Sequence, residues 1–247
     1  MKDKHLRLKR AARIMLLALL LGAAEMTNAL AQSFTVGDLN YSVNSDGTTV
    51  TVTGHVDGTS ATGQLEIPET VTYEETVYSV TEIGSWAFGN CRGFSGTLTI
   101  PTSVTMIGSS AFSGCSGFNG DLVIPSSITN LGSSAFSGCS FEEVYFNAIN
   151  VITASNFYGI FHGCSGHLNL SEDFVQIPDY MFYGAGFTGT LVIPNSVTSI
   201  GNSAFSGCSG FTGDLIIPNT MTTIGSNAFG GCSGFTGSLV IPNSVPR

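Results

Sequence analysis

The sequence predicts a mainly β repeat solenoid, and two observations lead to this prediction. The segment Leu98 to Cys115 returns almost letter for letter at 122–139, 191–208 and 215–232, with a period of 24 residues. A fixed period of this size is typical of a solenoid, because one unit cannot bury its apolar face alone and must stack on its neighbours. Each unit also holds two short stretches of alternating apolar and polar residues, and this alternation predicts strands.

The first 31 residues are typical of a secretory signal peptide. Basic residues between Lys2 and Arg13 precede a short apolar run, Ile14 to Ala24, and small residues then lead to a cleavage site that we expect after Ala31. The run is shorter than the about 20 residues that a membrane-spanning helix needs, so a membrane anchor is the weaker interpretation. We therefore expect a secreted or cell-surface protein without a membrane span.

Removal of this segment leaves a strongly acidic chain. Residues 32–247 contain 15 Asp and Glu against two basic residues, Arg92 and Arg247, for a formal charge of −13. Such a surface repels phosphate groups, which argues against nucleic acids and anionic membranes as partners.

Residues 32–64 predict an N-terminal β cap. Phe34 to Val43 and Thr48 to Gly54 alternate apolar and polar residues, and the connection between them contains an Asp-Gly pair. Alternation on both sides of an Asp-Gly turn predicts a β-hairpin. This hairpin stands where a solenoid needs cover over its first core layer.

The solenoid itself is expected at residues 65–247, with a first unit of 33 residues followed by units of 22–24 residues. Leu-x-Ile-Pro predicts a short strand that proline ends, since proline cannot donate a ladder hydrogen bond. Ser-Val-Thr-x-Ile-Gly predicts a second strand, and both should pair in parallel with the next unit. Ser-Ala-Phe-Ser-Gly-Cys is interpreted as a helical turn with Ala, Phe and Cys inward. The last repeat is cut off at Arg247, and its open end is a candidate surface for self-association.

Six cysteines share one repeat position, which predicts an inward-facing structural ladder. Their even number in an exported chain is compatible with disulfides, and stacked units would bring their Cα atoms within bridging range. Side chains in a ladder point the same way, however, which favours free thiols that behave as small buried apolar groups. The ladder consists of Cys91, Cys115, Cys139, Cys164, Cys208 and Cys232.

Other chemical motifs are weak. His162, Cys164 and His167 lie within six residues, but a zinc site needs four ligands or three and a water, and Cys164 belongs to the ladder. The acidic pairs at 74–75, 142–143 and 172–173 lack a pocket that would separate their pKa values. We expect no catalytic residue, no metal and no cofactor, and hence no enzyme.

The complete pattern Leu-x-Ile-Pro-x-Ser-Val-x-x-Ile-Gly-x-x-Ala-Phe-x-Gly-Cys resembles the BspA-like leucine-rich repeats of bacterial surface antigens. The resemblance covers residues 65–247. It implies a leucine-rich-repeat solenoid, export, and adhesion to host extracellular proteins or to other cells. A glycan is a further partner that we consider. It implies no catalytic residues, because the family pattern has none.

The stretch 144–190 departs from the pattern, and aromatic residues and histidines gather there. Asn147 and Ser171 replace the proline that ends the first strand, and Ala185 replaces cysteine. Exposed aromatic patches often mark a partner, whereas buried ones would refill a core disturbed by irregular repeat lengths. Both interpretations remain open for Tyr145, Tyr158, His162, His167, Tyr180 and Tyr183.

Trp86 replaces the Ser or Asn that precedes Ala-Phe in other units, and we expect it to pack beneath the cap rather than to contact a partner. The function that these features favour is non-catalytic binding. The alternatives are a structural or self-associating spacer and an accessory repeat domain of a larger exported protein.

Overall fold

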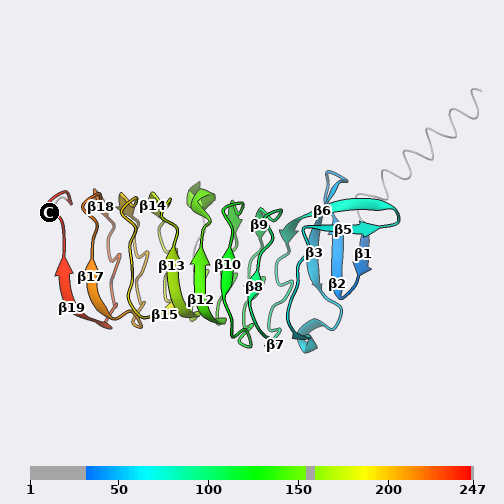
Figure 1. Ribbon diagram of the computed structural model, residues 1–247, viewed down its shortest axis with the longest axis horizontal. Coiled ribbons are helices and arrows are strands. Elements are labelled where there is room, and N and C mark those ends of the chain that lie inside the picture. Colours follow the sequence, from blue (N-terminus) through cyan, green and yellow to red (C-terminus); the bar gives the residue numbers. More distant parts are fainter. Residues whose placement is uncertain (1–31, 154–158, 246–247) are drawn as a thin grey trace, which may run out of the picture.

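The computed structural model describes residues 32–153 and 159–245, which form an elongated solenoid with its repeats stacked along the long axis (Figure 1). The cap lies at one end and the last repeat at the other. The predicted signal peptide falls outside the described residues. Of the helices that the structure describes, none has the length and apolar character needed to cross a membrane.

The cap opens a seven-stranded sheet that continues into the repeats. Strand β1 pairs antiparallel with β2, and β2 with β3, whereas β3 pairs in parallel with β6 and β6 with β9. Gly37, at φ +58°, lets the chain reverse inside the segment predicted as one strand, so the cap has three strands instead of a hairpin. The strands in order are β1 (Ser33–Val36), β2 (Leu39–Val43), β3 (Thr49–His55), β6 (Thr76–Ile83), β9 (Met106–Ile107) and β11 (Asn130–Leu131), with β5 (Thr70–Tyr73) antiparallel to β6.

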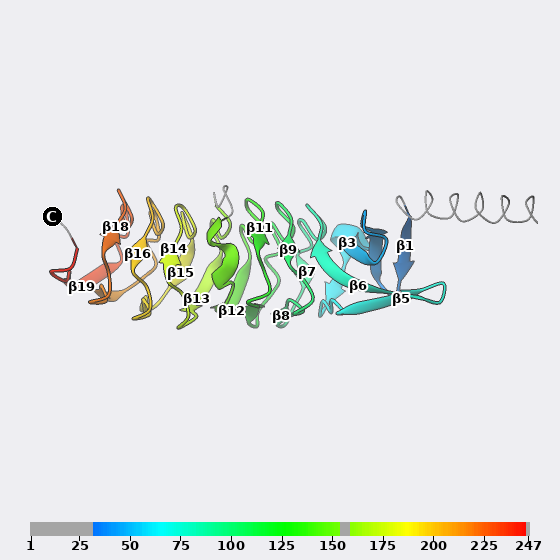
Figure 2. The ribbon, with the colours of Figure 1, turned by 90° about the horizontal axis from the view of Figure 1, so that it is seen from above.

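A second row of parallel strands runs along another side of the solenoid, as Figure 2 shows. It contains a five-stranded sheet of β15 (Gly186–Thr188), β13 (Ser165–Leu170), β12 (Ser140–Phe146), β10 (Leu122–Ile124) and β8 (Leu98–Thr99), and the pair β17 (Gly213–Ile216) and β19 (Phe235–Val240). The first row continues with β14 (Gln176–Ile177), β16 (Ser199–Ile200) and β18 (Thr223–Ile224), and the small pair β4 (Thr62–Gly63) and β7 (Gly93–Phe94) joins the cap region to the end of the first repeat.

The strand register confirms the repeat alignment, since Leu98 pairs with Leu122 and Leu122 with Val144. The inward residues of both rows are buried, and one phenylalanine from each repeat joins a continuous stack with neighbouring ring centroids 5.2–5.7 Å apart. This stack consists of Phe88, Phe112, Phe136, Phe161, Phe182, Phe205 and Phe229.

The segments predicted as helical turns are instead successive β-turns. Ser110 has φ +56°, which interrupts any α-helical series, and the N–H groups of Ala111, Ser113 and Cys115 donate to carbonyls three residues earlier. The alternate N–H groups donate to the next repeat at 2.7–2.9 Å, from Ser110 to Ser133, Phe112 to Ala135 and Gly114 to Ser137. A helix would use these donors internally, so the turns serve the stacking of repeats. The described helices are the short 3-10 segments Gly58–Ser60 and Ile149–Thr153.

Candidate functional site

The structure divides the predicted aromatic patch between two surfaces. We call the surface formed by the β-turns the turn edge; it comprises residues 86–90, 110–114, 134–138, 159–163, 180–184, 203–207 and 227–231. His162, Tyr180 and Tyr183 lie on the turn edge. Tyr145 and His167 belong to β12 and β13 and lie on the outer face of the five-stranded sheet, which we call the sheet face. Tyr158 falls outside the described residues.

The turn edge has one backbone position of special conformation in every repeat. The residue two before the stacked phenylalanine has a positive φ in all seven turns, between +51° and +64°. Glycine and asparagine tolerate this left-handed region, and a bulky side chain is rare there. The position is occupied by Trp86, Ser110, Ser134, Gly159, Tyr180, Ser203 and Asn227.

Trp86 is the clearest exception to the sequence prediction, because its side chain is 60% exposed and does not pack beneath the cap. The left-handed backbone at φ +61° directs the side chain away from the core, where Phe88 of the same turn is fully buried. The indole ring lies over Gly89, since a Cβ atom added there would be 2.5 Å from Trp86 Cε3.

Three side chains of two adjacent turns form what we call the aromatic group: His162, Tyr180 and Tyr183. The two tyrosine rings meet edge to face, with centroids 6.0 Å apart. Tyr180 is 39% exposed, Tyr183 is half-buried and His162 is exposed. The imidazole of His162 lies against Gly184, because a Cβ atom added to that glycine would be 2.6 Å from His162 Cδ2. The group therefore presents a partly apolar surface across the boundary between two repeats.

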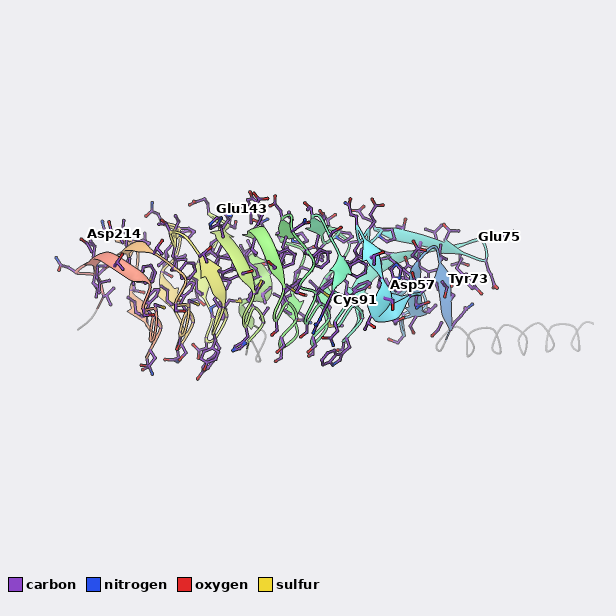
Figure 3. All side chains as sticks on the ribbon, turned by 90° about the horizontal axis from the view of Figure 1, so that it is seen from below. Asp57, Tyr73, Glu75, Cys91, Glu143 and Asp214 are labelled. Atoms are coloured by element: carbon purple, nitrogen blue, oxygen red, sulfur yellow. The ribbon has the colours of Figure 1, made fainter. Side chains whose placement is uncertain are left out.

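On the sheet face, Glu143 links the neighbouring strand by two contacts. Its carboxylate accepts a hydrogen bond from Asn169 Nδ2 at 2.7 Å and lies 3.1 Å from His167 Nδ1. Tyr145 stands beside Asn169 in the strand register and is 39% exposed. Figure 3 shows Glu143 at the outer rim of the solenoid. His167 thus faces a carboxylate, on a different surface from His162.

The two histidines do not converge with Cys164, which is fully buried. Across residues 32–153 and 159–245, no group of three or more His, Cys, Asp or Glu side chains is placed to hold a metal ion.

Sequence reasoning missed the apolar character of the sheet face in the C-terminal repeats. Val192, Ile216 and Val240 occupy the middle of Leu-x-Ile and are between 53% and 63% exposed. Leu239 and Ile241 are also exposed, at 60% and 54%, because β19 is paired on one side only. The sequence did contain a signal for this surface, because apolar residues stand at the outward-facing positions of the alternating strand pattern.

The cysteine side chains point into the solenoid, with five of them buried and Cys232 half-buried, and all six are free thiols. In most repeats the thiol donates to the carbonyl oxygen of the stacked phenylalanine one repeat earlier, as from Cys115 to Phe88 at 2.9 Å and from Cys208 to Phe182 at 3.0 Å. Burial raises the pKa of both thiols to about 12. Such thiols are poor nucleophiles, because the thiolate is the reactive form.

A hollow of about 890 Å³ lies where the cap meets the repeats, and no sequence motif indicated it. It is lined by the β1–β2 turn (36–39), the segment 64–72, and Thr97, Thr99 and Pro101 of the next repeat. The signal that could have found it is the length of the first unit, 33 residues, which leaves room for the β5–β6 hairpin.

Comparison with known proteins agrees with this architecture. The BspA type leucine rich repeat region matches in six copies over residues 69–166 and 175–247. A leucine rich cell surface protein from Faecalibacterium prausnitzii has a similar fold, with a TM-score of 0.51 and 24% identity over 83% of this chain and 54% of that chain. A leucine-rich repeat protein from Bacteroides ovatus gives a TM-score of 0.37 and 18% identity, over 86% of this chain and 89% of the other.

This chain thus spans about half the length of the Faecalibacterium protein. None of the curated proteins matches the sequence. Because the family pattern matches well over half of the residues and the structure repeats in the same register, the chain belongs to the BspA-type leucine-rich repeat family.

Proposed function

We propose that this protein is a non-catalytic binding protein, secreted or displayed at the cell surface, which adheres to an extracellular protein or glycan through the turn edge at the aromatic group. The observation that carries this proposal is the exposure of Tyr180 in the aromatic group at a left-handed backbone position of the turn edge, where Trp86 of the first turn is exposed as well. Other repeats fill the same position with Ser, Asn or Gly and have the same fold there.

Trp86, which is 60% exposed, and Tyr180, which is 39% exposed, gain less from burial than the stacked phenylalanines do. A side chain that stays in water gains only part of the about 1.5–3 kcal/mol available from burial of a large apolar group. Its backbone conformation is also rare for a bulky residue. Aromatic side chains dominate the free energy of protein interfaces, because they bury a large area at a small cost in conformational entropy. Binding therefore accounts for these residues better than stability does.

The titratable groups support a function without catalysis. Hydrogen bonds from the Thr49 side chain and from the backbone N–H groups of Thr48 and Thr49 lower the pKa of Asp46 to about 2, and they fix the turn between β2 and β3. Burial raises the pKa of the ladder thiols inside the core. Asp46 serves a turn and the thiols serve a core, whereas catalytic groups with shifted pKa values gather in a cleft. Burial also raises the pKa of Tyr41 to about 12 where this tyrosine borders the hollow between cap and repeats, but its side chain is 2% exposed.

Export and surface display are supported by the basic and apolar start of the chain and by the family. The acidic surface of residues 32–247 also favours neutral or basic partners over polyanions.

The test is a pull-down with residues 32–247 against extracellular matrix proteins, glycan arrays and intact cells. The double variant Y180S/Y183S gives the aromatic group the serines that Ser203 and Ser206 supply in the next repeat, so it should fold normally. We expect at least about a tenfold loss of binding, since interface aromatics contribute 2 kcal/mol or more. A matched control, V192T, changes the sheet face and should bind as the wild type does. Equal binding by wild type and Y180S/Y183S, or absence of any ligand, would contradict the proposal and favour a structural spacer.

A further inference from the structure

The cap protects the two rows of strands unequally. On one row, β3 pairs directly with β6, so the sheet passes from the cap into the repeats without interruption. On the other row, the five-stranded sheet begins at β8, whose one strand partner within the described residues is β10. The side of β8 that faces the cap is therefore a sheet edge.

The backbone groups on that edge can be identified from the register. Leu98 and Ile100 donate to the carbonyls of Asp121 and Val123 at 2.8 and 3.3 Å, so they face β10. Alternate residues of a parallel strand face opposite neighbours, and the N–H and carbonyl of Thr99 consequently face the first repeat. The bonds that the repeat would make there, from Leu65 and Ile67 to the carbonyls of Thr97 and Thr99, are missing in the described structure.

In the described residues, hydrogen bonds join the two segments at the ends of this gap. At one end, the N–H of Ser95 donates to the carbonyl of Gly63 at 2.8 Å. At the other end, the hydroxyl of Thr102 donates to a carboxylate oxygen of Glu69, also at 2.8 Å. Between these points the chain from 64 to 68 runs beside β8 without backbone hydrogen bonds to it.

The hollow shows that the gap is open. Its volume is about 890 Å³, and it is lined from both sides, by residues 64–68 and by Thr97, Thr99 and Pro101. Leu191–Ile193 also lack strand pairing, but they lie between two repeats and not beside the cap.

The lining of the hollow indicates the chemistry of an occupant. It contains the carboxylates of Asp38, Glu66 and Glu69, and it contains no Lys or Arg. Its one histidine, His55, has Nδ1 at 3.8 Å from a carboxylate oxygen of Asp57. The volume falls within the about 300–1,000 Å³ typical of ligand sites. Free backbone donors and acceptors along a strand edge bind an extended peptide by strand addition, in which main-chain hydrogen bonds supply the affinity.

We propose that this hollow binds an extended, basic segment of a partner protein, which adds a strand to the free edge of β8. The site lies on the sheet side next to the cap, away from the aromatic group. Its test is therefore independent of the function proposed above. Edge-to-edge pairing with a second copy is disfavoured, because it would bring the same carboxylates together.

Amide hydrogen exchange on the unbound protein tests the open edge. The amide of Thr99 should exchange at least about 100-fold faster than that of Val123, whose N–H faces the paired strand β8, because protection follows hydrogen bonding in the stable core. Equal protection of Thr99 and Val123 would mean that the edge is closed and would overturn the proposal.

Peptide binding tests the occupant. The probe is a fluorescent heptapeptide of alternating lysine and valine, with the glutamate–valine peptide as its charge control. The lysine peptide should bind at least about tenfold more tightly, and N-methylation of alternate amides should abolish the difference. T99P removes the free donor without touching the β8–β10 ladder and should weaken binding, whereas T99V retains the donor and should not. E66Q should weaken binding of the lysine peptide at low salt.

Three results would overturn the proposal: equal binding of both peptides, binding unaffected by N-methylation, or concentration-dependent dimers that disappear in T99P. If T99P fails to fold by circular dichroism, the N-methylated peptide with the wild-type protein answers the same question.

Discussion

Replacement of Phe205 by alanine is the sharpest test of the stacked core. Phe205 is fully buried, and its ring stacks on Phe182 at 5.2 Å and on Phe229 at 5.4 Å. Its N–H also donates to Ala228 of the next repeat, and its carbonyl accepts the thiol of Cys232. The substitution leaves these backbone contacts in place and removes only the ring.

The size of the effect follows from these contacts. Truncation of a buried phenylalanine costs about 3–5 kcal/mol, and each aromatic pair contributes about 0.5–1.5 kcal/mol beyond burial. With a stacked partner on both sides, F205A should lose about 5 kcal/mol. Phe229 is only partly buried and stacks on one ring, so F229A should lose about 2–3 kcal/mol.

Urea unfolding followed by far-ultraviolet circular dichroism measures both losses. Trp86 is exposed and would be a poor fluorescence reporter of the core. Since neighbouring repeats stabilise one another, the slope of the transition should be compared as well as its midpoint. Equal losses in F205A and F229A, or a loss below about 1 kcal/mol in F205A, would refute the stacking argument.

Two further predictions concern the repeat positions that the family pattern fixes. Burial raises the pKa of the Cys115 thiol to about 12, so the folded state binds this proton more tightly than the unfolded state does. The thiol's contribution to the free energy of unfolding should therefore be fully present below about pH 9 and should be lost as the pH rises towards 12. The fall should be shallower in C115A. Urea midpoints between pH 8 and 11 measure this, and parallel curves would contradict it. G132A should lower the free energy of unfolding by about 2–3 kcal/mol, because a Cβ atom there would overlap the backbone of Gly108 and Ser109. A melting temperature equal to that of wild type would show that the repeats can separate freely.

Much of the fold could be predicted from the repeat period, because a fixed spacing of leucine, isoleucine and phenylalanine leaves one way to bury all of them. The turn at Ser110 to Cys115 could not, since its conformation depends on hydrogen bonds to the next repeat. Apolar spacing alone does not distinguish a helical turn from β-turns that donate alternate N–H groups to a neighbour.

The candidate site was harder to predict for the same reason. The exposure of Trp86 follows from a left-handed backbone that the neighbouring serine repeats also adopt, and residue type gave no hint of it. The aromatic residues of the irregular stretch were recognised, but the sequence could not assign them to different surfaces. The gap beside β8 depends on how the cap and the first repeat pack together, which is a tertiary feature.

The free energy of unfolding of Y180S/Y183S tests the central claim most directly, because it requires no ligand. If these rings serve binding and not the core, the variant should unfold within about 1 kcal/mol of wild type, well below the loss that truncation of a buried aromatic side chain causes. A loss of more than about 2 kcal/mol, comparable with truncation of a buried side chain, would show that the tyrosines belong to the core and would contradict the account.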